Sequence, residues 1–156
     1  MHSHSDYIIA YIAFVRAAYS WFHAAHHVTS GAAFAGDHEL YSEIYNDYLQ
    51  VLDGIIEKSV GSCGIETVAA PIPSLELSIA VLKGYPSPES MTSLAIAGAA
   101  LQLEQDYLQA TDELFRTLEQ MGSLPLGLND FLAASANKHD TFVYKLTQRV
   151  KSEVQD

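Results

Sequence analysis

Cysteine and positive charge are both scarce in this chain of 156 residues. The single cysteine, Cys63, cannot form an internal disulfide, and nothing resembles a cysteine-based zinc site. We therefore expect a reducing, cytoplasmic setting. Eight Lys and Arg residues stand against 19 Asp and Glu residues, for a formal net charge of -11. This charge argues against nucleic acid or an anionic membrane as a partner and favours cations, of which metal ions are the simplest.

The longest apolar run, from Tyr7 to Val28, is long enough to be considered as a membrane span. It carries Arg16 near its middle and histidines at its end, and the few residues before it contain no Lys or Arg. These features are atypical of a membrane span or a signal sequence. We expect a core helix and no membrane partner.

Glycine, proline and capping residues cluster between long stretches that lack them, which predicts four long helices in a single domain over residues 1–156. We expect Asp37, Ser87 and Asn129 to start the later helices, and Gly61 to end the second. The predicted ranges are 6–30, 37–60, 87–121, and 129 to the C-terminus.

Short loops join the first helix to the second and the third to the fourth, whereas residues 61–86 are too many for a tight turn. Residues 74–83 within that connection favour a short helix of their own. One long middle crossover is the ferritin-like connectivity. The sequence thus predicts an all-α, ferritin-like four-helix bundle with a short helix in the crossover.

The second predicted helix carries two distinct faces. Tyrosines and branched aliphatic residues form its core stripe. His38, Asp53 and Glu57 fall on another arc, and three aliphatic residues share that arc. These aliphatic residues are Leu49, Ile56 and Val60. Aliphatic side chains among polar ones indicate that this second face meets another subunit.

His38 and Asp53 are 15 residues apart, roughly 22 Å along a helix, so one copy of the helix cannot place both on one metal ion. Two copies paired antiparallel about a two-fold axis would bring His38 of one chain opposite Asp53 and Glu57 of the other. The two carboxylates, at i and i+4, can aim at one point. Iron would accept this mixture of ligands. Acidic residues at this spacing also occur on ordinary solvated helix faces.

The stretch from His26 to Gly61, HHVTSGAAFAGDHELYSEIYNDYLQVLDGIIEKSVG, resembles the signature of the Dps family, the mini-ferritins that protect bacterial DNA during starvation. In that family a His ends the first helix, Gly and Phe lie in the turn, and a second His follows, with an Asp and a Glu a turn apart further on. His26, His38, Asp53 and Glu57 match these positions with the family's spacing. The resemblance implies a twelve-subunit shell in which these four residues bind iron at the two-fold interface.

The resemblance also implies a reaction. The protein would be a ferroxidase that oxidises Fe(II) with hydrogen peroxide or oxygen, stores ferric iron and protects against oxidative damage. Iron is the cofactor that the resemblance implies, and the four residues that bind it would also be the catalytic residues.

Two positions depart from the family pattern. Ser42 stands where the family has an Asp one turn after the second His, so one carboxylate ligand is missing. Glu43 or Glu39 could replace it, or Ser42 could hydrogen-bond a metal-bound water. His27 stands where many members have Trp, and is either an added ligand or a histidine at the surface or core edge. The alternative function is a non-catalytic shell that has lost the site.

Two further sets of residues have open interpretations. His23 and His27, at i and i+4, are either metal ligands or partly buried histidines bonded to backbone or tyrosine. Asp130 either resembles the acidic residues of the family's iron pores or complements a helix N-terminus. A di-iron centre within one subunit would need a Glu-x-x-His pair, which the sequence lacks.

DNA binding is the other activity of the family, and the charge pattern argues against it. Members that bind DNA usually use tails rich in Lys or Arg, and residues 1–6 contain neither. Lys145, Arg149 and Lys151 lie in the last predicted helix, whose dipole favours cations at that end. We expect the negative shell to repel DNA unless magnesium bridges them, and a DNA-compacting protein stays as a further alternative.

Overall fold

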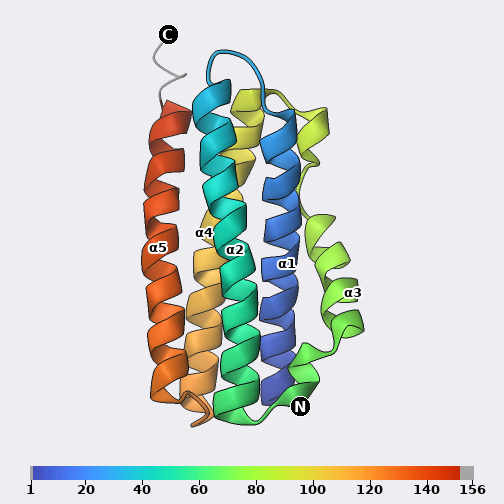
Figure 1. Ribbon diagram of the computed structural model, residues 1–156, viewed down its shortest axis with the longest axis vertical. Coiled ribbons are helices and arrows are strands. Elements are labelled where there is room, and N and C mark those ends of the chain that lie inside the picture. Colours follow the sequence, from blue (N-terminus) through green and yellow to red (C-terminus); the bar gives the residue numbers. More distant parts are fainter. Residues whose placement is uncertain (1, 152–156) are drawn as a thin grey trace.

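The computed structural model describes residues 2–151 as a bundle of four long helices with a shorter helix on its outside (Figure 1). The bundle helices are α1 (His4–Val28), α2 (Phe34–Cys63), α4 (Ser93–Gln120) and α5 (Leu126–Lys151). The long connection holds η1 (Glu66–Ala69), α3 (Pro71–Leu82) and η2 (Pro88–Ser90). The expected all-α bundle with a long middle crossover and a short crossover helix is confirmed.

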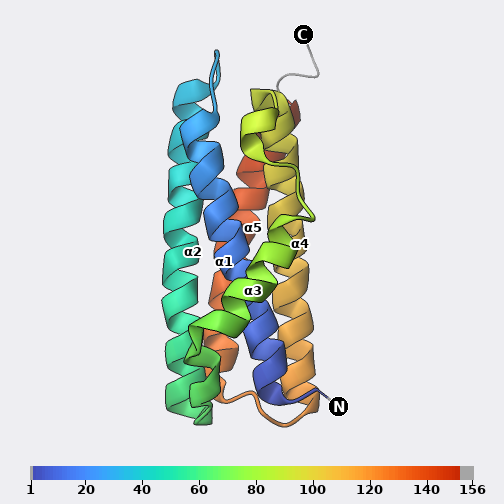
Figure 2. The same cartoon turned by 90° about the vertical axis from the view of Figure 1, so that its right-hand side faces the viewer.

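The short helix α3 runs obliquely across the outer side of α1 (Figure 2). Arg16 on α1 donates a hydrogen bond from Nε to Ser74 Oγ on α3, at 3.0 Å. Trp21, one and a half turns further along α1, donates from Nε1 to the carbonyl oxygen of Pro86 at 2.9 Å. Side chains of α1 therefore fix the crossover at two points along its length.

The predicted ends of the second helix are wrong. It begins at Phe34, and Asp37 lies buried in its first turn, where its carboxylate accepts hydrogen bonds from Arg149 at 2.7 and 3.0 Å. The helix continues through Gly61 to Cys63. It ends at Gly64, whose φ of 67° is the left-handed conformation that glycine adopts without steric cost.

The starts of the two later helices also differ from the prediction. Pro88 begins the separate turn η2, and α4 begins at Ser93, where the hydroxyl of Thr92 accepts a hydrogen bond from the Ala95 amide at 3.2 Å. Helix α5 begins at Leu126, directly after Pro125, so Asn129 is not its cap. The Thr92 side chain caps a free backbone N–H at the start of α4, and α5 starts directly after a proline. Both are helix-start signals that are compatible with the sequence.

Helix α1 has the most apolar composition of the four long helices, and it buries many of its side chains in the core of the bundle. Among the described residues it alone is long and apolar enough to cross a membrane by those two criteria, and 56% of its most apolar window is buried. Its fully buried side chains include Ile8, Ile12, Val15 and Phe22. The apolar run from Tyr7 therefore forms the core helix that the sequence predicts.

The second apolar arc of α2 is only partly a free surface. Ile56 and Val60 are half-buried and pack against the chain's own core, whereas Leu49 is 39% exposed. Ile56 and Val60 therefore lie partly in the chain's own core, and Leu49 is the exposed member of the three. That this face meets another subunit stays a prediction.

We predict opposite effects for the same substitution at two glycines of α2. At Gly54 an added Cβ would lie 2.3 Å from Cε2 of Phe131 on α5, so Gly54→Ala should destabilise the protein by about 1–3 kcal/mol. At Gly61 nothing lies within 4 Å, so Gly61→Ala should stabilise it by about 0.5–1 kcal/mol. Urea unfolding at equal protein concentration measures both. If Gly54→Ala stabilised the protein instead, the Phe131 ring would have to move away from the added methyl group at little energetic cost.

Candidate functional site

His26, near the end of α1, and His38, in the second turn of α2, form a stacked pair. Their ring centroids are 3.7 Å apart with 22° between the ring planes. His26 Nδ1 lies 2.7 Å from the carbonyl oxygen of His38, and His38 Nδ1 lies 2.8 Å from the carbonyl oxygen of His26. Because a carbonyl oxygen can only accept, each Nδ1 carries the proton and donates it. In the neutral imidazole each Nε2 then keeps its lone pair, the form in which histidine binds metal.

The short turn between α1 and α2 brings these two histidines together. Gly31 has a φ of 83°, a conformation that side chains disfavour, so glycine makes this tight turn possible. Phe34 packs its ring 4.9 Å from that of His38, and Tyr45 packs its ring 5.3 Å from that of His26. The pair is thus held from both sides by aromatic rings.

Asp53 and Glu57 lie on the same helix as His38 but far from the histidine pair. Both are exposed, and neither forms a hydrogen bond or ion pair with another described residue. The unbroken course of α2 keeps Asp53 roughly 22 Å from His38. Within residues 2–151, no group of three or more His, Cys, Asp or Glu is placed to hold a metal ion. One chain therefore brings His26 and His38 together. It also brings Asp53 and Glu57 together, but at a different place along α2.

The residues that could replace the missing carboxylate point elsewhere. Ser42 is half-buried, and its hydroxyl accepts a long hydrogen bond of 3.4 Å from Asn46. The carboxylate of Glu43 accepts a hydrogen bond from Lys145 on α5 at 2.7 Å. Glu39 lines the same surface hollow as Glu43 and Lys145. Neither Glu39 nor Glu43 is therefore positioned as a metal ligand beside the histidine pair.

His23, His27 and Asp130 are all exposed. The two histidines are therefore not the partly buried pair that one interpretation of the sequence predicts. Their Nε2 atoms face each other at 3.4 Å. Asp130 lies in the second turn of α5, because that helix begins at Leu126, so it is not adjacent to the helix start.

A buried charged cluster that the sequence analysis missed lies in the middle of the bundle. His139 on α5 is fully buried, with Nε2 2.9 Å from the carboxylate of Asp47 on α2 and Nδ1 2.6 Å from that of Glu104 on α4. Lys138 also donates to Asp47, and the hydroxyl of Tyr48 donates to Glu104 at 2.6 Å. We refer to Asp47, Glu104 and His139 as the core triad.

Hydrogen bonding decides the protonation of the core triad. Burial by itself lowers the pKa of His139, but its hydrogen bonds to Asp47 and Glu104 outweigh burial and raise that pKa above its usual value. Burial likewise raises the pKa of Asp47, and the hydrogen bonds from His139 and Lys138 outweigh it and lower that pKa. The imidazole is thus a cation that donates to a carboxylate from each ring nitrogen.

This arrangement differs from that of a metal centre. The two carboxylates bind opposite nitrogens of one imidazole, so the three side chains do not converge on one point. The charges are already matched, and a cation placed there would displace the imidazolium proton. The core triad is a set of buried ion pairs.

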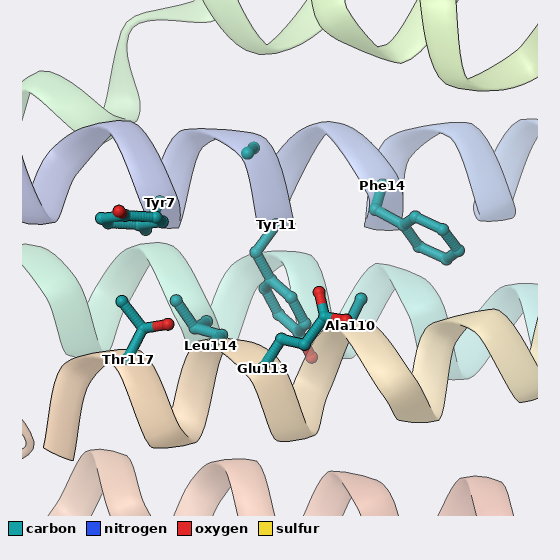
Figure 3. Close-up of a pocket in the computed structure, with 8 residues that line it drawn as sticks. Tyr7, Tyr11, Phe14, Ala110, Glu113, Leu114 and Thr117 are labelled. Atoms are coloured by element: carbon teal, nitrogen blue, oxygen red, sulfur yellow. The ribbon is translucent and has the colours of Figure 1, made fainter. Parts of the chain in front are cut away.

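Hydroxyl groups extend the polar network toward α1. Tyr107 shares a hydrogen bond of 2.6 Å with Ser135 and accepts one of 2.8 Å from Tyr11, whose hydroxyl lies 3.0 Å from that of Thr111. Tyr11 also lines a hollow of about 220 Å³ between α1 and α4 (Figure 3). The polar core therefore spans the bundle from α5 to α1.

One sequence signal points to the core triad. Asp47 lies three residues after Ile44 and four before Val51, both on the core stripe of α2, so helical periodicity places a carboxylate inside the bundle. Such a residue requires a buried partner. Periodicity does not identify that partner, because His139 is 92 residues away in the chain.

The structure has the architecture of ferritin-like proteins, and solved structures bear this out. No protein-family model matches the sequence, and no curated protein matches it significantly. The Dps protein of Vibrio cholerae O1 superposes with a TM-score of 0.76 at 15% identity, over 94% of this chain and 88% of that one. It is described as a member of a broad superfamily of ferritin-like diiron-carboxylate proteins.

Two other solved structures are similar. Mycobacterium smegmatis Dps gives a TM-score of 0.72 at 17% identity, over 92% of this chain and 82% of that one. Helicobacter cinaedi CAIP gives 0.69 at 18% identity, over 95% of this chain and 99% of that one. This chain therefore has the ferritin-like fold of the Dps proteins, which confirms the resemblance as far as the fold is concerned.

We predict that His139→Leu destabilises the protein by about 3–5 kcal/mol, because two buried carboxylates lose the imidazolium that both of them bind. Urea unfolding measures the loss. As a control, Arg116→Ala removes only the exposed ion pair with Asp112 and should change stability by less than about 1 kcal/mol. Equal losses in the two variants would contradict a special role for the core triad.

The same cluster predicts how stability depends on pH. The pKa of His139 is raised, so its contribution is complete below pH 6.5, its ordinary value, and is lost as pH rises through the folded value. The pKa of Asp47 is lowered, so its contribution is present above pH 3.8 and is lost as pH falls through the folded value. Together they stabilise most between those limits. Unfolding midpoints across pH should show an alkaline loss that His139→Leu lacks.

Proposed function

We propose that this protein is a Dps-like mini-ferritin that oxidises Fe(II) at a site shared by two subunits and stores the ferric product in a shell. The observation that carries the proposal is the His26 and His38 pair. Its reciprocal bonds to backbone carbonyl oxygens leave two Nε2 atoms free to bind iron. A stacked pair with both tautomers fixed in this way is prepared to bind metal before any metal arrives.

A second subunit would supply the remaining ligands. Asp53 and Glu57 are exposed and one turn apart on α2, and no hydrogen bond or ion pair within residues 2–151 engages either carboxylate. Two α2 helices paired antiparallel about a two-fold axis would bring them to the histidine pair of the neighbour. The four ligands would be His26 and His38 from one chain with Asp53 and Glu57 from the other. Each dimer would hold two such sites.

Exposed apolar residues support assembly. Helix α3 leaves Ile72 65%, Leu75 47%, Leu77 45% and Ile79 54% exposed on the outside of the bundle. Apolar side chains gathered on one helix indicate a surface that another protein covers. We propose that further copies of this chain cover it, in a homo-oligomer that the Dps resemblance suggests is a shell of twelve.

Iron is the substrate in this scheme, and hydrogen peroxide or oxygen is the oxidant. Imidazole nitrogens hold Fe(II), and the hard carboxylate oxygens favour the Fe(III) product, so the mixed ligand set serves both oxidation states. Removal of Fe(II) together with peroxide would protect against oxidative damage. A single cysteine without a disulfide partner suits a cytoplasmic location.

The alternative is a non-catalytic shell, and Ser42 is the observation that favours it. A serine there adds no charge to the site, and Glu43, the nearest replacement in sequence, is bonded to Lys145. The site would then have four ligands and one fewer carboxylate than the family pattern. Iron oxidation decides between the two.

We predict that His38→Ala and Glu57→Ala each slow Fe(II) oxidation at least about tenfold, because each removes a ligand from a site that already lacks one. Ser42→Asp should speed it by adding a hard oxygen one turn from His38. Stopped-flow absorbance of ferric iron measures the rates, and size exclusion checks that assembly is intact.

Glu43→Ala is the matched control, since it removes a carboxylate engaged with α5. If it is as damaging as Glu57→Ala, then Glu43 is a ligand. If none of the four variants changes iron oxidation, the non-catalytic shell is the better conclusion. Elution of the wild type as a monomer of 17.1 kDa would remove the basis for a shared site.

We predict that duplex DNA is not retained by this protein in a gel shift at neutral pH and moderate salt. Two of the basic residues of α5 are engaged within the chain, because Arg149 bonds to Asp37 and Lys145 to Glu43. The net charge of -11 repels phosphate. Addition of magnesium tests for a bridged complex. A strong shift without magnesium would contradict the prediction.

A further inference from the structure

A second pair of histidines lies on α1, beside the His26 and His38 pair. His23 and His27 are one turn apart and both exposed. Their rings are perpendicular with centroids 4.8 Å apart, and their Nε2 atoms face each other at 3.4 Å. The two rings therefore direct the same kind of nitrogen at one point in solvent.

The separation of these nitrogens matches that of two ligands on one metal ion. Zinc binds histidine nitrogen at about 2.0–2.1 Å in tetrahedral geometry, which places two ligand nitrogens about 3.3 Å apart. The 3.4 Å contact is a long hydrogen bond in which one Nε2 donates to the other, and a zinc ion between the two nitrogens would take the place of its proton.

Neighbouring aromatic rings restrict the position of His23. Tyr19 stacks on it, with centroids 5.6 Å apart and 17° between the planes, and Tyr45 on α2 meets it edge to face at 5.1 Å. His27 in turn packs against His26, with centroids 5.0 Å apart. Such contacts reduce the side-chain entropy that metal binding would otherwise cost.

We propose that His23 and His27 bind one Zn²⁺ ion per chain, with water completing the tetrahedron. Imidazole binds zinc, nickel, copper and iron, and a given site generally binds Zn²⁺ more tightly than Fe²⁺. The location in the last turns of α1 adds to this preference, because the C-terminal end of a helix favours positive charge. Two protein ligands are fewer than a structural zinc site has, so the ion exchanges with solvent.

The zinc site is independent of the proposed iron site. Both of its ligands belong to one helix of one chain, whereas the iron site needs a second subunit. The proposal therefore holds whether or not the protein oxidises iron, and its test is a binding measurement.

Calorimetric titration of the intact protein with zinc chloride tests the proposal. Since the iron ligands can also bind zinc, the titration uses the His38→Ala/Glu57→Ala double variant as background. We expect about one zinc ion per chain in this background. Adding His23→Gln or His27→Gln should remove that ion or weaken its binding more than about tenfold. Both positions are exposed, so circular dichroism should show unchanged helix content.

His2→Gln is the matched control, because it also removes one exposed histidine from the same chain. It should retain the zinc ion. Loss of zinc in His2→Gln, or unchanged binding in both His23→Gln and His27→Gln, would overturn the proposal. X-ray absorption of the zinc-loaded background should show two imidazole rings around the ion, and a count of one or none would also overturn it.

Discussion

The arrangement of this bundle depends on a set of buried charges at its centre. The imidazolium of His139 donates to carboxylates on two other helices, Asp47 on α2 and Glu104 on α4. Removal of any one member leaves a charge in a medium that solvates it poorly, so all three helices must keep their relative register.

The core triad also occupies the interior of the bundle with matched charges. In a ferritin-like bundle the interior between the helices is one place for a metal centre. Here that interior holds matched ion pairs and hydroxyl groups, which do not converge on a single point. Candidate metal ligands are found instead at the surface, near the turn between α1 and α2, where four histidines and Tyr45 lie together.

Two neighbouring histidine pairs in this region are organised differently. His26 and His38 bond to each other's backbone carbonyl oxygens through Nδ1. His23 and His27 contact each other through Nε2 on one helix, and within residues 2–151 no carboxylate joins them in a group that could hold a metal. The two pairs therefore differ in the ligands that could join them, which is the reason for proposing a different metal at each.

Sequence alone determined the number of long helices, the long crossover with its short helix, and the distance between His38 and Asp53. These follow from local rules, because glycine, proline and the helical repeat act over a few residues. The pairing of His26, His38, Asp53 and Glu57 across subunits stays a prediction, since it concerns a second copy.

Only the tertiary structure decided the partners of buried and half-buried groups. Asp37 has the sequence of a helix cap and instead bonds to Arg149, 112 residues away. Ile56 and Val60 have the spacing of an outer face and instead pack on their own core. Asp47 is recognisable as a carboxylate on an apolar stripe, but His139 is not recognisable as its partner. The physical reason is that helical periodicity fixes the direction of a side chain, whereas its partner depends on how distant helices pack.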